Sequence, residues 1–267
     1  MTVPILDSSA WREFRGKPNS SGINNTIHLA KIADMEGKLH DCFVKLLPLN
    51  YPSLLGEAIG WLLTRSTNVP CAKFAAIVLV PLDQLRKNID LPLEFDNEKV
   101  CPAWCCEVIP GNSLRQIHKW DSSIVLRKCL RSVDARKIAS FDIWTDLRDR
   151  NCGNVIKSSN GGYISIDHET ILHDLLWLPS GRGYDARSLL TEAQQHLPFL
   201  EFQRFQVDMA KASEIHAKGL ALLSNDLAEI VHKIYPHLSD TMAPEIIDML
   251  KKRAQVGWLA NTLGVIA

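Results

Sequence analysis

The sequence has no excess of charge of either sign: among its 267 residues, 30 lysines and arginines balance 30 aspartates and glutamates. A chain without net charge has no overall field that would attract it to nucleic acid or to an anionic membrane surface. Long apolar runs are lacking as well, and the longest, residues 74–82, is about half as long as a membrane-spanning helix. We therefore expect no nucleic-acid partner and no membrane association.

The N-terminus lacks the basic segment and long apolar stretch that mark a secretory signal peptide. The seven cysteines also lack a pattern, because no two have the C-x-x-C spacing that zinc ribbons and redox sites use. Most have apolar neighbours, and a free cysteine in such surroundings usually packs as a small buried hydrophobe. We expect a protein of the reducing cytoplasm, with seven cysteines that serve mainly in packing: Cys42, Cys71, Cys101, Cys105, Cys106, Cys129 and Cys152.

The first part of the chain has the patterns of a strand-rich fold. A polar loop is expected over 18–26 and a charged surface excursion over 83–100. Helical spacing of apolar residues predicts one helix, over 53–66. The strands predicted from apolar and β-branched runs cover 27–33, 40–47, 75–80 and 104–109.

After a Pro-Gly-Asn turn at 110–112 the periodicity becomes helical, over 123–139, 141–144 and most of the chain from 186. Only a short hairpin, with strands at 155–157 and 163–166, interrupts it, and its Asn-Gly pair is a strong turn signal. The sequence therefore predicts an α+β fold. Its N-terminal, strand-rich part covers 1–110, and its larger helical part covers 111–267.

The clearest chemical signal lies just before this hairpin. Residues 141–156 (F-D-I-W-T-D-L-R-D-R-N-C-G-N-V-I) combine three acids, two arginines and two asparagines, and an apolar strand beyond the hairpin leads to Asp167. Phosphoryl transfer needs such a set: one carboxylate positions the nucleophile, while an asparagine and a second carboxylate hold magnesium. The spacing places Asp149, Asn154 and Asp167 at one edge of the hairpin.

The run D-R-N-C-G-N at 149–154, followed by Ile-Asp at 166–167, resembles the catalytic core of HipA-like kinases and of the related phosphatidylinositol 3- and 4-kinases. The F-D-x-W segment at 141–144 is most similar to the bacterial HipA-like branch. The resemblance implies a two-lobed kinase-like fold with a β-rich N-terminal lobe and a helical C-terminal lobe. It also implies that Asp149 is the catalytic base and that Asn154 and Asp167 are magnesium ligands.

Upstream, the same resemblance assigns residues that would bind ATP in a cleft between the lobes. Lys45, in F-V-K, would bind the nucleotide and take part in catalysis, and Glu57 in the following helix would orient it through an ion pair. A loop over 19–25 would cover the phosphates, and residues 105–109 would form the hinge that meets adenine. The expected cofactor contacts in these two segments are Ser20, Ser21, Gly22, Glu107 and Ile109.

Other interpretations of these residues are open. Lys45 could be an exposed strand lysine, and Glu57 a solvated glutamate of an amphipathic helix. His168 could bind a metal or contact phosphate, but a lone histidine beside a carboxylate is more often structural. Asp142 could be an ordinary helix-end acid or, as we favour, a group that braces the catalytic loop. Ser20 and Ser21 could also be autophosphorylation sites, although serines are common in loops.

HipA-like relatives phosphorylate serine or threonine on proteins and often belong to toxin–antitoxin systems. The expected function is therefore an ATP- and Mg²⁺-dependent protein kinase, with a cognate antitoxin or another regulatory protein as a further partner. The alternatives are a lipid or small-molecule kinase and a catalytically silent kinase-like binding module. The full set Lys45, Asp149, Asn154 and Asp167 argues against the second. It stays open because the loop has the single glycine Gly22 and because Leu147 stands where the family often has asparagine. The sequence also departs from the family after Asp167, where His168 and Glu169 stand in place of Phe-Gly.

Overall fold

The computed structural model describes residues 1–18, 26–117 and 122–266 and shows an α+β protein with a mixed sheet, as the sequence predicts. The chain divides into two compact units. The sheet unit comprises Thr2–Leu54 and Ala72–Val108, and the helical unit comprises Met1, Leu55–Cys71 and Ile109–Ala267. Residues 55–71, which the sequence assigned to the N-terminal part, thus group with the helical unit. No helix in the described part of the chain is both long and apolar enough to cross a membrane.

The sheet unit is built on six strands in the order β1-β5-β6-β4-β3-β2. β1 pairs with β5 in parallel, and every other neighbouring pair is antiparallel. The turn between β3 and β4 forms because Asp34 Oδ1 accepts hydrogen bonds from the backbone N–H groups of Glu36 and Lys38, and Gly37 supplies a φ of +81°. The strands are β1 (Ile5–Leu6), β2 (Trp11–Gly16), β3 (Ile27–Ala33), β4 (Leu39–Leu46), β5 (Ala75–Pro81) and β6 (Val100–Glu107).

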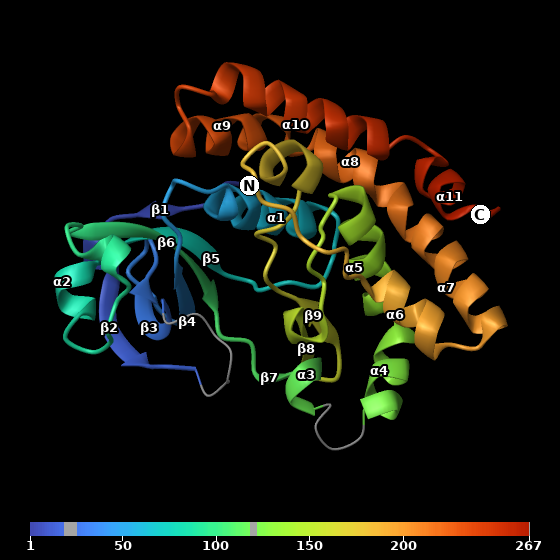
Figure 1. The fold of residues 1–267 in the computed structure, drawn as a ribbon, viewed down its shortest axis with the longest axis horizontal. Helices are drawn as coiled ribbons and strands as arrows, with labels where there is room; N and C mark the ends of the chain where they lie inside the picture. The colour runs from blue at the N-terminus through green and yellow to red at the C-terminus, as the bar shows by residue number, and fades with distance from the viewer. Residues whose placement is uncertain (19–25, 118–121, 267) are drawn as a thin grey trace. The chain divides into compact units, whose positions relative to one another are not determined.

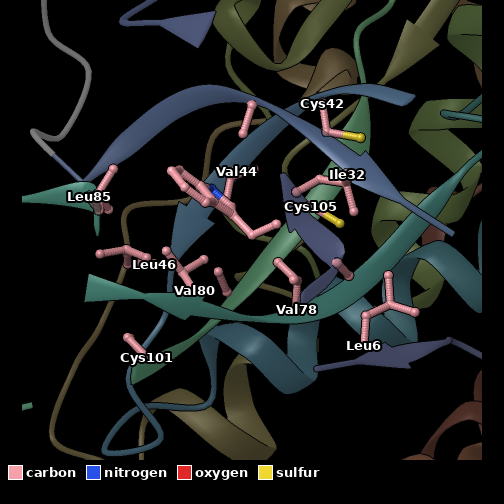
Figure 2. Close-up of a cluster of buried hydrophobic side chains, with 14 of the residues drawn as sticks. Leu6, Ile32, Cys42, Val44, Leu46, Val78, Val80, Leu85, Cys101 and Cys105 are labelled. Carbon is pink, nitrogen blue, oxygen red and sulfur yellow. The ribbon is translucent and has the colours of Figure 1, made fainter. Parts of the chain in front are cut away.

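The core of the sheet unit follows from the alternation of side chains along the strands. Figure 2 shows Cys42, Val44 and Leu46 of β4 beside Cys101 and Cys105 of β6 in one apolar cluster. All seven cysteines are free thiols and four are buried, so the prediction that they serve in packing is confirmed for those four.

The expected surface excursion over 83–100 is wrong in part. It contains a helical turn, α2 (Leu82–Leu85), and a short 3₁₀ turn over Leu93–Phe95, and it buries Leu85, Ile89 and Phe95 in the core. A helical turn places apolar residues on one face and charged residues on the other. These three apolar side chains can therefore be buried although charged residues surround them in the sequence.

The helical unit consists mainly of α-helices and includes one small sheet (Figure 1). Its helices are α1 (Ser53–Ser66, from Leu55), α3 (Leu114–Ile117), α4 (Ser122–Leu130), α5 (Val133–Trp144), α6 (Leu189–His196), α7 (Phe199–Ala212), α8 (His216–Ala221), α9 (Ser224–Ile234), α10 (Ser239–Arg253) and α11 (Trp258–Leu263). α9 packs beside α10, and α5 beside α7. A small antiparallel sheet consists of β7 (Gly111–Ser113), β8 (Val155–Ser158) and β9 (Tyr163–Ser165).

Two details of the helical unit bear on the sequence predictions. The helix expected over 123–139 is two helices, α4 and α5, because the side chain of Ser132 caps the backbone N–H of Ala135 and starts a new helix there. The hairpin of β8 and β9 forms as predicted, and Gly161 adopts a φ of +96° in its turn.

Candidate functional site

The segment that follows α5 is held in place by one buried arginine. Arg150 Nε and Nη2 donate to the two carboxylate oxygens of Asp142, at 2.9 Å each, and both side chains are almost fully buried. Its Nη1 donates to the backbone carbonyls of Asn154 at 3.0 Å and Ile166 at 2.6 Å. Arg150 thus ties the last turn of α5 to the loop at 149–154 and to the end of β9. The prediction that Asp142 braces this loop is confirmed.

The environment of Asp142 combines two opposing effects on its carboxyl group. Burial raises the pKa of Asp142, and the charge and hydrogen bonds of Arg150 oppose that rise. Because each carboxylate oxygen accepts a hydrogen bond from the guanidinium fork, the pair has the bidentate geometry of an ion pair.

Asp149 has one carboxylate oxygen that is engaged and one that is open. Oδ1 accepts from Asn151 Nδ2 at 3.1 Å and lies 3.9 Å from Arg187 Nη1. Within residues 1–18, 26–117 and 122–266, Oδ2 has no hydrogen-bond partner, and the side chain is 35% exposed. The backbone N–H of Asp149 donates to Thr170 Oγ1 at 3.3 Å, which fixes the residue. A half-exposed carboxylate with one open oxygen is suited to accept a proton.

Asn154 lies at the end of a 3₁₀ turn, Cys152–Asn154, in which the N–H of Gly153 donates to the side-chain Oδ1 of Asn151 at 2.8 Å. Its Nδ2 donates to the backbone carbonyl of Asp149 at 2.8 Å. That bond fixes the orientation of the side-chain amide, because its nitrogen faces the carbonyl of Asp149. Its oxygen, which binds metal ions better than the amide nitrogen does, therefore points away from that carbonyl.

Asp167 adjoins Asn154 through the backbone. The N–H of Ile166, the residue before Asp167, donates to the carbonyl of Asn154 at 3.2 Å. Asp167 itself has a φ of +60°, a left-handed conformation that is uncommon for a residue other than glycine. Such a conformation at the end of a strand persists only when its surroundings enforce it, and it concentrates at functional sites.

Helix α1 fixes the backbone of the residues just after Asp167. Glu57 Oε2 accepts from the backbone N–H of His168 at 2.9 Å, and Glu57 is only 3% exposed. On the same face of α1, a Cβ atom added to Gly56 would lie 2.2 Å from the carbonyl oxygen of Glu169, and one added to Gly60 would lie 2.3 Å from His168 Cβ. The interpretation of Glu57 as a solvated glutamate is therefore wrong.

His168 is structural, as one interpretation held. Its Nε2 is 2.8 Å from Ser165 Oγ, and its ring packs edge-on against Phe141. Burial, with a smaller effect from the charge of Arg150, lowers the pKa of His168 to about 3. The imidazole is therefore neutral at physiological pH and serves as a packing and hydrogen-bonding group.

The remaining predicted site residues are Lys45, Glu107, Ile109 and the loop residues 20–22. Lys45 is a half-buried residue of β4, between Ile27 of β3 and Trp104 of β6. Glu107 ends β6, and both it and Lys45 belong to the sheet unit, whereas Ile109 begins the last segment of the helical unit. Ser20, Ser21 and Gly22 lie outside the described residues. The structure thus brings together Asp149, Asn154, Asp167 and Glu57, all in the helical unit.

Three residues of the site had no assigned role from the sequence. Arg150 belongs to the D-R-N-C-G-N run, so its spacing could have indicated a clamp. Thr170 and Arg187 reach Asp149 from 21 and 38 positions further along the chain. Neither stands in a pattern that would indicate that contact.

A second group of titratable side chains lies close by. Asp146, His173 and Asp174 have oxygen and nitrogen atoms near enough to surround one ion. Asp146 and Asp174 already bind Arg148, at 3.1 and 3.2 Å, and Arg253 lies 3.8 Å from Asp146. These arginines balance the acids, so the group is an ion-pair network.

Comparison with known proteins adds no family to these observations. No protein-family model matches the sequence, and no curated protein matches it significantly.

Proposed function

We propose that the protein is an ATP- and Mg²⁺-dependent phosphotransferase of the HipA-like type, with a two-lobed kinase-like organisation, and that its acceptor is a serine or threonine hydroxyl of another protein. The observation that carries the proposal is the arrangement around Asp149. Its Oδ2 has no hydrogen-bond partner in the part of the chain that the structure describes, the amide of Asn154 is fixed against its backbone, and Asp167 adjoins Asn154. This is the set of groups that phosphoryl transfer requires.

In the proposed reaction Asp149 accepts the proton of the acceptor hydroxyl as its oxygen bonds to phosphorus. The carbonyl oxygen of Asn154 and the carboxylate of Asp167 are the oxygen ligands that would hold magnesium. Magnesium, when bound, neutralises charge on the nucleotide phosphates. Arg150 keeps these groups in register, because it binds the loop and the strand end at once. Lys45 and Glu107 enter the proposal through the family resemblance alone.

The experiment compares the wild type with Asp149→Asn. We expect the wild type to bind ATP more tightly with Mg²⁺ and to release ADP, and phosphoserine or phosphothreonine to appear on proteins of the expressing cell by mass spectrometry. Asp149→Asn should keep the nucleotide affinity and slow turnover by roughly 10²–10⁴. Asp248→Asn, in an exposed aspartate of α10, is the matched control and should behave as the wild type. A wild-type protein that neither binds Mg-ATP nor transfers phosphate would refute the proposal.

A further inference from the structure

Arg187 is placed beside Asp149 by the backbone. The N–H of Arg187 donates to the carbonyl of Arg148 at 2.7 Å, and the N–H of Arg150 donates to the carbonyl of Arg187 at 3.0 Å. These bonds make a parallel bridge between Asp149 and Arg187. Directly paired residues of parallel strands send their side chains to the same side. The guanidinium therefore stands next to the carboxylate, with Nη1 3.9 Å from Oδ1.

The donors of this guanidinium are largely unused. Asp149 is its one partner in the described part of the chain, at a distance beyond that of a hydrogen bond, and the side chain is 60% exposed. Arg150, by contrast, uses its donors on Asp142 and two carbonyls. An exposed and long ion pair adds little to stability. The backbone thus places a positive charge close to Asp149, and this charge contributes little to the stability of the fold.

Arg187 and Asp149 also share a pocket. It has a volume of about 260 Å³ and is lined by Asp149, Gly183, Tyr184, Asp185 and Arg187. A hydroxyl that donates to Asp149 would lie about 2.8 Å from the carboxylate, and the phosphorus that it attacks lies one bond further on. The Arg187 guanidinium, 3.9 Å from the same carboxylate, would therefore be close to the oxygens of that phosphoryl group.

We propose that Arg187 is a further catalytic residue, which donates hydrogen bonds to the phosphoryl group during transfer; this rests on the proposed function. In that step the bond between the acceptor oxygen and phosphorus forms, and the bond from phosphorus to the β–γ bridging oxygen breaks. The hydroxyl proton passes to Asp149, the electron pair of the broken bond leaves with ADP, and Arg187 stays protonated. Its planar fork matches two phosphoryl oxygens. An arginine supplied within the same chain has this effect in other phosphoryl-transfer enzymes.

The test uses the full chain and Mg-ATP, with water as the acceptor, and follows ADP release. We expect Arg187→Ala and Arg187→Gln to lower kcat by about 100-fold or more, with KM for ATP within about threefold of the wild type. Arg187→Lys should recover part of kcat, because it restores the charge but not the fork. Arg182→Ala, which removes the same charge from the same exposed loop, should leave kcat unchanged.

Affinity for Mg-ADP with aluminium fluoride, a mimic of the phosphoryl group in transfer, gives a second readout by titration calorimetry. It should fall in Arg187→Ala while affinity for Mg-ATP is kept, and melting curves show whether the variants are folded. A kcat within about threefold of the wild type in both Arg187→Ala and Arg187→Gln, or an effect on KM alone, overturns the inference. A wild type that neither binds Mg-ATP nor transfers phosphate to water or to protein overturns the proposed function instead, and with it the role of Arg187.

Discussion

The guanidinium of Arg150 and the carboxylate of Asp142 face each other through two hydrogen bonds of 2.9 Å, and both groups are shielded from water. Asp142 comes from the last turn of α5, and Arg150 from the loop that carries Asp149. The pair therefore connects helix α5 with the candidate site. Its two members depend on each other, because either one alone would be a buried charge without a partner.

Removing one member should be costly. We expect Arg150→Met to destabilise the protein by about 3–5 kcal/mol in urea unfolding at pH 7, the usual cost of leaving a buried charge unpaired. Because burial raises the pKa of Asp142 and Arg150 opposes that rise, the variant should protonate Asp142 more readily, so its deficit should shrink as the pH falls. Arg131→Met, which breaks an exposed pair with Glu201, is the control and should change stability little. A loss below about 1 kcal/mol for Arg150→Met would contradict the structure at this point.

Asp167→Asn tests the proposed metal ligand without disturbing the backbone. Asparagine tolerates the left-handed conformation that Asp167 adopts, whereas alanine would add strain. We expect the variant to melt close to the wild type and to lose most of the gain in ATP affinity that Mg²⁺ provides. Titration calorimetry with and without Mg²⁺ measures this gain in each protein. If Mg²⁺ strengthens ATP binding equally in both, Asp167 is not a ligand.

Lys45 distinguishes a nucleotide contact from an ordinary strand lysine. As a nucleotide contact, it should be replaceable by neither alanine nor arginine, because a compact ammonium and a broad guanidinium fork need different geometry. Both variants should then impair phosphate transfer. As a strand lysine, it should change stability by less than about 0.5 kcal/mol in either variant and leave activity intact. Lys31→Ala, on the adjacent strand β3, is the control for the loss of a lysine from this sheet.

Gly60→Ala should destabilise the protein although alanine is the better helix former by about 1 kcal/mol. The added Cβ atom would lie 2.3 Å from His168 Cβ, so that α1 or the segment after Asp167 must shift. We expect a net loss of about 1–3 kcal/mol, the usual cost of overpacking. We also expect turnover to fall, because the shift would reach Asp167. Chemical unfolding and ADP release measure the two effects, and a stabilised variant would show that this contact is looser than described.

The buried histidines should make the protein sensitive to acid. Burial lowers the pKa of His216, which stacks on Trp144, to about 3, and among the described residues its Nδ1 has no hydrogen-bond partner. The unfolded chain takes up this proton below about pH 6.5 and the folded chain does not, so the stability present above that pH is lost as the pH falls toward 3. The slope is up to about 1.4 kcal/mol per pH unit for each such histidine.

His216→Phe removes this titration and keeps an aromatic ring on Trp144. Its free energy of unfolding, measured in urea at pH 7, 6, 5 and 4, should therefore fall less steeply than that of the wild type. The same slope in both proteins would mean that His216 is protonated in the folded state, in conflict with its burial.

The sequence predicted those parts of the site that depend on local spacing. Asp149 and Asn154 lie in one short loop, and an Asn-Gly hairpin returns the chain to Asp167, so short-range signals suffice to bring the three together. Contacts between distant segments gave no such signal. The approach of Gly56 and Gly60 to residues 168–169 spans more than 100 positions. It depends on how α1 packs, which helical periodicity does not specify.

The secondary structure shows the same difference between features that the sequence predicted and features that it did not. The β3–β4 and β8–β9 hairpins were predicted because adjacent strands and their turns carry the signal. β2 was not predicted, because half of its residues are charged and register shifts between Trp11 and Glu13 and between Phe14 and Gly16 break the apolar alternation. The split between α4 and α5 was missed because the apolar spacing runs on through Ser132, while the break comes from a single capping hydroxyl.

The chain passes between the two units at residues 54, 71 and 108, and this has a practical consequence for dividing the protein. A gene fragment that begins at residue 109 would encode Asp149, Asn154 and Asp167 but not α1. It would lack Glu57, the hydrogen-bond acceptor of the His168 N–H, and would leave that donor and the surface against Gly56 and Gly60 uncovered. Truncation at residue 109 would therefore yield a fragment that lacks a structural part of the candidate site. A minimal version of the helical unit has to include residues 55–71 as well, although they are separated from residue 109 in the sequence.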